Sequence, residues 1–275
     1  MKKRSAQIRA ERRHIMIGAI IGDIVGSRFE FHNRLSKDFA FFHPDCDFTD
    51  DTVMTCAVAQ ALMDSREDFP DLPEKTVAAM QRIGRQYPNC GYGAKFIRWM
   101  FTDNPLPYNS CGNGAAMRIS PVGFLARDTE EAKKLSAAVT AVSHNHPEGI
   151  KGAEATAVAI VLARQGRTKD EIRKAMAEYY DLGMTVEEYR NTWQGHGKEI
   201  CQISVPQALT CFFEGEDFED VIRNCISIGG DSDTIAAIAG GIAEAFYGVP
   251  EKHREKALQF LDPGLRDIVT AFDTR

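Results

Sequence analysis

The segment Ile228-Gly-Gly-Asp-Ser-Asp-Thr-Ile-Ala-Ala-Ile-Ala-Gly-Gly241 joins two carboxylates to a long run of small apolar residues. The run 235–246 is almost entirely Ala, Ile and Gly, which predicts a buried and tightly packed helix. The Gly229-Gly230 pair predicts the turn that leads into it. Asp231 and Asp233 at the mouth of such a helix are costly unless positive charge meets them. The helix N-terminus supplies part of that charge, and a bound metal ion would supply far more.

A second acidic cluster, Thr49-Asp50-Asp51-Thr52, precedes another apolar helix. Small and apolar residues recur with helical spacing over 53–63, and Thr49 or Asp50 is a natural N-cap. Either cluster alone is most simply a helix cap. Together, their carboxylates and Thr hydroxyls form an all-oxygen ligand set that suits Mg²⁺ or Mn²⁺ rather than Zn²⁺. Such a set can hold two ions that share one carboxylate.

Composition indicates one ordinary globular domain. The chain has 275 residues, of which 44% are hydrophobic and 26% charged, and a chain of this length can bury a large core. The net charge of −6 argues against general binding to nucleic acid or an anionic membrane. The seven scattered cysteines contain no Cys-x-x-Cys pair, which favours reduced thiols and a cytoplasmic location. No apolar run is long enough to span a bilayer.

The pattern along the chain predicts an all-α, single-domain orthogonal helical bundle, because strand-like alternation is nearly absent and no repeat is found. Residues 1–14 are basic and are expected to form a flexible extension ahead of a domain over 15–275. Segments 28–48 and 182–198 are irregular in pattern. The expected helices are 15–26, 53–63, 73–86, 94–101, 130–142, 153–164, 168–180, 205–213, 218–226, 235–246 and 252–272, the last with a break near Pro263-Gly264.

Two further stretches carry polar groups suited to a ligand. The loop 109–118 is rich in Gly, Asn and Ser, and its backbone N–H groups could cradle a phosphate. Met117 stands where a dinucleotide-binding fingerprint needs a third Gly, so that interpretation fails. Arg118 could pair with phosphate or with a core acid. His144 and His146 lack partners for a zinc site, so each is either a hydrogen-bonding turn residue or a contact to ligand.

Four stretches together resemble the ADP-ribosylglycohydrolase family, which includes the dinitrogenase reductase-activating glycohydrolases. They are GDIVGSRFE (22–30), FTDDT (48–52), GNGAAMRISPVG (112–123) and IGGDSDT (228–234). The resemblance runs from Met16 to about Gly248. It implies an all-α fold with two Mg²⁺ or Mn²⁺ ions at the base of a cleft.

The resemblance also implies roles for particular residues. Glu30 and Asp233 would be catalytic, and Asp233 would bridge the two ions. Cys111 stands where some relatives carry Tyr, so no aromatic contact is expected there. The implied metal ligands are Thr49, Asp50, Asp51, Asp231, Asp233 and Thr234. The implied substrate-binding residues are Gly91, Tyr92, Gly93, Ser110, Cys111, Gly112, Asn113, Gly114 and His144.

The expected reaction is hydrolysis at the anomeric carbon of the distal ribose, which releases ADP-ribose from a modified partner. ADP-ribosyl-arginine on protein is the leading substrate, and ADP-ribosyl-serine, O-acetyl-ADP-ribose and nucleic-acid-linked ADP-ribose are alternatives. Nucleic acid is therefore a partner only if it is itself modified, and no membrane is expected. A non-catalytic ADP-ribose binder would be expected to have lost some acids. An unrelated Mg²⁺-dependent phosphohydrolase is disfavoured because no Lys or Arg lies beside either acidic cluster.

Overall fold

The computed structural model describes residues 16–192 and 198–274. Within these two ranges the chain forms helices and one isolated β-bridge, between Gly112 and Ile200, and no β-strand. The prediction of an all-α, single-domain fold is confirmed. The predicted extension over residues 1–14 lies outside the described residues.

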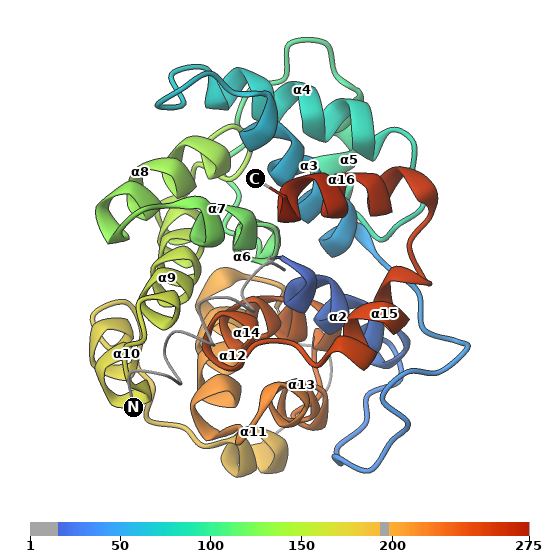
Figure 1. Ribbon diagram of the computed structural model, residues 1–275, viewed down its shortest axis with the longest axis vertical. Coiled ribbons are helices and arrows are strands. Elements are labelled where there is room, and N and C mark those ends of the chain that lie inside the picture. Colours follow the sequence, from blue (N-terminus) through green and yellow to red (C-terminus); the bar gives the residue numbers. More distant parts are fainter. Residues whose placement is uncertain (1–15, 193–197, 275) are drawn as a thin grey trace.

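Short connections join most of the helices along the chain (Figure 1). None of those in the described ranges combines the length and the apolar character that a membrane span requires. Their bounds are α2 (Ile17–Gly26), η1 (Ser27–Phe29), α3 (Asp50–Asp64), α4 (Leu72–Gly84), α5 (Ala94–Phe101), α6 (Gly114–Met117), α7 (Ser120–Leu125), α8 (Thr129–Thr140), α9 (Pro147–Arg164), α10 (Lys169–Met176), α11 (Val186–Thr192), α12 (Cys201–Glu214), α13 (Phe218–Ser227), α14 (Ser232–Tyr247), α15 (Glu251–Leu258) and α16 (Pro263–Asp273).

Helix α14 is the centre of the packing. Every residue from Ser232 to Ala245 is buried, and the helix contacts α2, α6, α7, α9, α12 and α13. Figure 1 shows α2 beside α14, with α3, α4, α5 and α16 in the upper half of the view. Helix α3 packs against α4 and α16, and α15 packs against α2. The two acidic clusters open α3 and α14, and these two helices also contact each other.

The contact between α2 and α14 is unusually close because α2 presents a stripe of glycines. Gly18, Gly22 and Gly26 recur every four residues, so they share one face of the helix. A Cβ built on Gly18 would lie 2.4 Å from the Gly240 carbonyl oxygen, and one built on Gly22 would lie 2.1 Å from the Ala236 carbonyl oxygen. No side chain fits between the two backbones, which touch directly.

The turn into α14 follows the predicted pattern. Gly229 and Gly230 have φ values of 72° and 81°, a left-handed conformation that costs glycine little. Helix α14 begins at Ser232 with Asp231 as its N-cap residue, three residues before the predicted start at 235. The acids are thus part of the first turn of the helix rather than a loop before it.

Two other predictions of local structure differ in outcome. The C-terminal region does break near Pro263: Asp262 caps α16 by accepting a hydrogen bond from the Leu265 N–H at 3.0 Å. Segment 182–198, predicted to be irregular, contains helix α11 over Val186–Thr192. Its short length and polar composition hide the helical period, and residues 193–197 lie outside the described part of the chain.

We expect Gly22→Ala to destabilise the protein by about 2 kcal/mol or more. Alanine normally stabilises a helix relative to glycine by roughly 0.5–1 kcal/mol, but here overpacking against the Ala236 carbonyl dominates. Urea denaturation measures the difference. Gly93→Ala is the control, because nothing lies within 4 Å of its added Cβ, and it should cost about 1 kcal/mol or less. Equal stability of the two variants would contradict the close contact.

Candidate active site

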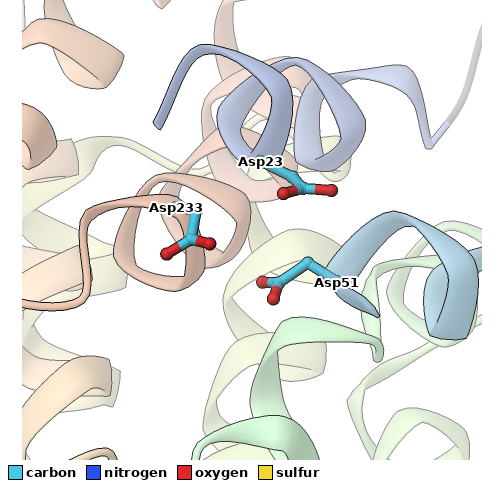
Figure 2. A group of neighbouring side chains, drawn as sticks. All are labelled: Asp23, Asp51 and Asp233. Carbon is cyan, nitrogen blue, oxygen red and sulfur yellow. The ribbon is translucent and has the colours of Figure 1, made fainter. Parts of the chain in front are cut away.

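Three carboxylates from three helices lie close together at the site. Asp23 comes from α2, Asp51 from the first turn of α3 and Asp233 from the first turn of α14, and Figure 2 shows the three side chains near one another where these helices meet. One oxygen of each lies within 4.8 Å of the others. A second group with the same property consists of Glu30, Asp231 and Asp233. Asp233 belongs to both groups.

Asp23 is a site residue that the sequence analysis missed. Its carboxylate accepts hydrogen bonds from the Thr49 N–H at 2.9 Å, the Thr49 hydroxyl at 2.7 Å and the Thr52 N–H at 3.0 Å, and also from the Thr52 hydroxyl. It thereby ties the start of α3 to α2. The signal for it was present, because Asp23 is the single charged residue in the otherwise apolar run Ile17–Gly26.

The residues predicted as ligands lie at the mouths of α3 and α14. Thr49 is the N-cap of α3, and its side chain accepts a hydrogen bond from the Asp51 N–H at 3.3 Å. The Thr234 hydroxyl donates to Asp51 Oδ2 at 3.2 Å, which links the mouth of α14 to the mouth of α3. Asp50 lies against the Gly91 loop, where a Cβ on Gly91 would be 3.1 Å from its Oδ1.

The cluster is short of positive charge. Asp51 Oδ1 and Asp233 Oδ1 are buried and have no hydrogen-bond partner. Burial, and then repulsion from neighbouring carboxylates, holds the pKa values of Asp51 and Asp233 well above their usual range. The same two causes raise the pKa of Glu30 to about 7. Several carboxylate oxygens that lie close together, two of them without a hydrogen-bond partner, fit a divalent cation such as Mg²⁺ or Mn²⁺.

A cavity of about 560 Å³ opens over these acids, within the usual size range of small-molecule sites. Most residues predicted for the site line it. They are Glu30, Thr49, Asp50, Asp51, Gly91, Gly93, Ser110, Gly112, Asn113, Gly114, His144, Asp231, Asp233 and Thr234.

Tyr92 and Cys111 were also predicted for the pocket but are not among its lining residues. Tyr92 is 5% exposed and belongs to the hydrophobic core, with its ring centroid 5.7 Å from that of Phe96. The two glycines beside it carry the chain past the cavity while its ring points inward. Cys111 is half-buried, and its carbonyl accepts a hydrogen bond from the Cys201 N–H at 3.0 Å.

Asn113 lines the cavity and also hydrogen-bonds one of the acids. Its Nδ2 donates to Asp231 Oδ2 at 2.5 Å and to the Ser204 hydroxyl at 2.9 Å. The Gly-rich loop that carries it is fixed by the bridge between Gly112 and Ile200. The amide of Asn113 therefore holds one of the predicted ligands in place.

Glu30 lies in segment 28–48, which was predicted to be irregular. Asn33 hydrogen-bonds this segment to the turn next to Asp231. Asn33 Nδ2 lies 2.9 Å from the Glu30 carbonyl oxygen and 3.0 Å from the Gly230 carbonyl oxygen, and Asn33 Oδ1 accepts from the Gly230 N–H at 2.8 Å. Arg223 provides a second fastening through the carbonyls of residues 37 and 39. A single asparagine in a loop carries no pattern, so sequence reasoning could not find it.

Aromatic and basic side chains form another part of the wall. The centroid of the His144 ring lies 5.5 Å from that of the Tyr108 ring and 6.3 Å from that of the Phe96 ring. Lys95 and Arg118 are the Lys and Arg side chains among the lining residues. His146 does not share this position: it caps α9 by accepting from the Glu148 N–H at 3.1 Å.

The described residues form a helical domain with a carboxylate-rich cavity at the mouths of two helices, and the acids of this cavity could hold a metal ion, as in a helical hydrolase. Comparison with known proteins identifies the family. The profile of the ADP-ribosylglycohydrolase family matches residues 4–272, and the chain belongs to this family. The resemblance noted in the sequence is confirmed, and the protein is a glycohydrolase enzyme.

Similar proteins cover most of the chain. ADP-ribosylhydrolase ARH3 of Homo sapiens is 26% identical, over 88% of this chain and 88% of its own length. ADP-ribosylarginine hydrolase Tri1 of Pseudomonas putida is 24% identical, over 85% of this chain and 70% of its own length. A solved structure described as an ADP-ribosylglycohydrolase-related protein complex superposes with a TM-score of 0.70 at 22% identity, over 96% of this chain and 95% of that chain.

We expect Asp23→Asn to weaken binding of Mg²⁺ or Mn²⁺ by about tenfold or more, the usual cost of losing a group that orients metal ligands. An amide at this position turns an N–H₂ group toward the donors of Thr49 and Thr52. Isothermal titration calorimetry measures the change. Asp47→Asn is the control, since Asp47 lies at the cavity and accepts from the Phe48 N–H. Unchanged affinity in the Asp23 variant would contradict this role.

The raised carboxyl pKa values predict a pH-dependent effect of divalent ions on stability. The pKa of Asp23 is raised to about 6 and that of Glu30 to about 7, above unfolded values of about 4. The folded metal-free protein thus binds more protons than the unfolded chain between these values, so its stability falls as pH rises from about 4 to about 7.

Divalent ions should therefore raise the melting temperature more at pH 8 than at pH 5.5. Scanning calorimetry with Mg²⁺, with Mn²⁺ and with a chelator measures this difference. Asp233→Asn should remove most of it, because Asp233 belongs to both groups of acids. An equal shift at both pH values would argue against a cation site at these carboxylates.

Proposed function

We propose that this protein hydrolyses the bond between the distal ribose of ADP-ribose and an acceptor, with arginine on a modified protein as the leading acceptor. The observation that carries the proposal is the pair of partnerless buried oxygens, Asp51 Oδ1 and Asp233 Oδ1, among the residues that line the cavity. A cation would stabilise buried carboxylate oxygens in this position. A cation held at an open cavity can bind the hydroxyls of a ribose.

Two Mg²⁺ or Mn²⁺ ions are the proposed cofactor. Asp233 would be shared between them, because it belongs to both three-acid groups. When bound, the ions supply charge that orients the ribose and lowers the pKa of a water molecule. The ligands would be Thr49, Asp50, Asp51, Asp231, Asp233 and Thr234.

Glu30 is the proposed proton carrier. Burial and the nearby charges of Asp231 and Glu199 raise its pKa to about 7, so it can both accept and donate a proton near neutral pH. The attacking water gives its oxygen to the anomeric carbon and one proton to Glu30. The bond from that carbon to the acceptor breaks, and the leaving group takes up a proton from Glu30. The surrounding carboxylates stabilise the positive charge that builds on the ribose ring.

The remaining cavity wall suits the rest of ADP-ribose. Backbone N–H groups at the start of α5 and in the loop 110–114 would bind the pyrophosphate, near the charges of Lys95 and Arg118. Phe96 and Tyr108 line the cavity and offer rings for stacking on adenine. Binding energy from these contacts would hold the scissile bond over the acids.

Arginine is favoured as the acceptor for two reasons. Tri1, one of the similar proteins, is an ADP-ribosylarginine hydrolase. Glu199 lines the cavity and adds its charge to that of Glu30, and two acids beside the scissile bond favour a cationic guanidinium over a neutral acceptor.

Release of free ADP-ribose from a set of conjugates tests the proposal. The set holds arginine-, serine- and nucleic-acid-linked ADP-ribose and O-acetyl-ADP-ribose, each with Mg²⁺, Mn²⁺ or a chelator. We expect release from the arginine conjugate at least about tenfold faster than from the others, which corresponds to about 1.4 kcal/mol, and none with chelator. Fastest release from another conjugate would reassign the acceptor, and no release from any would refute the proposal.

Asp231→Asn and Asp233→Asn should each lower the rate by at least about a hundredfold, because each removes a charged oxygen that faces the reacting ribose. Asp217→Asn is the matched control. Asp217 caps α13 by accepting from the Asp220 N–H at 2.8 Å, so it is also an acid at a helix mouth but lies away from the cavity. Its variant should keep full activity. Similar losses in all three variants would indicate a structural effect.

A further inference from the structure

His144 has two unlike environments at its two ring nitrogens. The residue is 5% exposed, and its Nε2 faces the Gly-rich loop of the cavity. A Cβ built on Gly114 would lie 3.3 Å from Nε2, and one on Gly112 would lie 3.5 Å from it. The Nδ1 atom faces the interior, where the Ser143 hydroxyl lies at 2.9 Å and Arg118 Nη2 at 3.4 Å.

The interior partners determine which nitrogen carries the proton. A guanidinium has only donors, and Arg118 Nη2 donates to the Ser143 hydroxyl oxygen at 2.8 Å. The hydroxyl hydrogen of Ser143 is then free to point at Nδ1. Arg118 can only donate to Nδ1, and the Ser143 hydroxyl can donate to it as well, so both contacts are satisfied when Nδ1 is an acceptor. A neutral ring with an accepting Nδ1 carries its hydrogen on Nε2.

Burial, together with the charge of Arg118, keeps the His144 ring neutral. The Arg118 side chain is buried, its Nε has no hydrogen-bond partner, and its guanidinium lies 5.6 Å from the Phe96 ring centroid. Burial lowers the pKa of Arg118 to about 10, so it remains charged at neutral pH. Burial and this neighbouring charge both lower the pKa of His144 well below its usual value. The core acid that the sequence suggested as a partner for Arg118 is not among its hydrogen-bonded neighbours.

We propose that Arg118 and Ser143 are positioning residues that fix His144 as the Nε2–H tautomer, so that its ring donates a hydrogen bond into the cavity. The group that accepts it is an anionic oxygen next to the Gly112 and Gly114 backbone, which on the proposed function is a pyrophosphate oxygen of ADP-ribose. The opposite tautomer would present a lone pair and repel such an oxygen. Only the identity of the acceptor rests on the proposed function.

Nitrogen NMR of protein labelled with ¹⁵N-histidine tests the tautomer directly. The His144 signals are identified by their loss in His144→Gln. At neutral pH we expect Nδ1 to show the chemical shift of an unprotonated nitrogen and Nε2 that of a protonated one. Adding ADP-ribose should move the Nε2-bound proton downfield, whereas adenosine, which has no phosphate, should not.

Two substitutions test the positioning role. Arg118→Met removes the donor, so Ser143 can accept from Nδ1–H; we expect the Nδ1–H tautomer to become populated and ADP-ribose affinity to fall about tenfold. Ser143→Ala leaves Arg118 to donate to Nδ1, and the Nε2–H tautomer should persist. Arg85→Met, at an arginine bonded to the Met100 carbonyl, should leave the His144 signals unchanged.

Each result bears on a separate part of the proposal. A wild-type ring protonated at Nδ1, or one that exchanges between tautomers, would overturn it, and this measurement does not depend on whether Arg118→Met folds. An Nε2–H tautomer that does not respond to ADP-ribose would overturn the phosphate contact alone. Failure to hydrolyse any ADP-ribose conjugate would contradict the proposed function and leave the tautomer result standing.

Discussion

The direct backbone contact between α2 and α14 is the constraint on which the rest of the site depends. A Cβ on Gly26 would lie 2.5 Å from the Cα of Asp233, so the end of α2 and the mouth of α14 are held against each other. Asp23, one turn earlier on α2, then reaches the mouth of α3 through Thr49. One close helix pair thus places both acidic clusters.

The acids themselves oppose folding. Carboxylates that are buried together repel one another and lose hydration, and Asp51 and Asp233 each keep an oxygen without a partner. The structure offsets part of this cost with polar contacts: Asn113 donates to Asp231, and Thr234 donates to Asp51. The N-termini of α3 and α14 add favourable dipoles. These contacts do not offset all of the negative charge of the acids, and this remaining charge is the basis for proposing a bound cation.

Patterns that are local in the sequence predicted most of this arrangement. The apolar periods of α3 and α14 and the Asp-Thr groups at their mouths are each visible within a dozen residues. The features that were missed join residues far apart: Asp23 with Thr49, Asn33 with Gly230, and Arg118 with Ser143 and His144. Tyr92 was predicted to line the cavity but packs in the core. A glycine-flanked ring in a loop gives no sign in the sequence that it turns toward the core.

The fastening of Asn33 to the turn at Gly230 has a mechanical consequence. The segment that carries Glu30 and the turn that carries Asp231 move as one body while these hydrogen bonds last. A displacement of this segment away from the turn must break both hydrogen bonds between Asn33 and Gly230, and so must also loosen the turn next to Asp231. Access to the cavity and the rigidity of its acidic wall are therefore linked equilibria, and the time for which a bound molecule stays enclosed depends on residues that need not touch it.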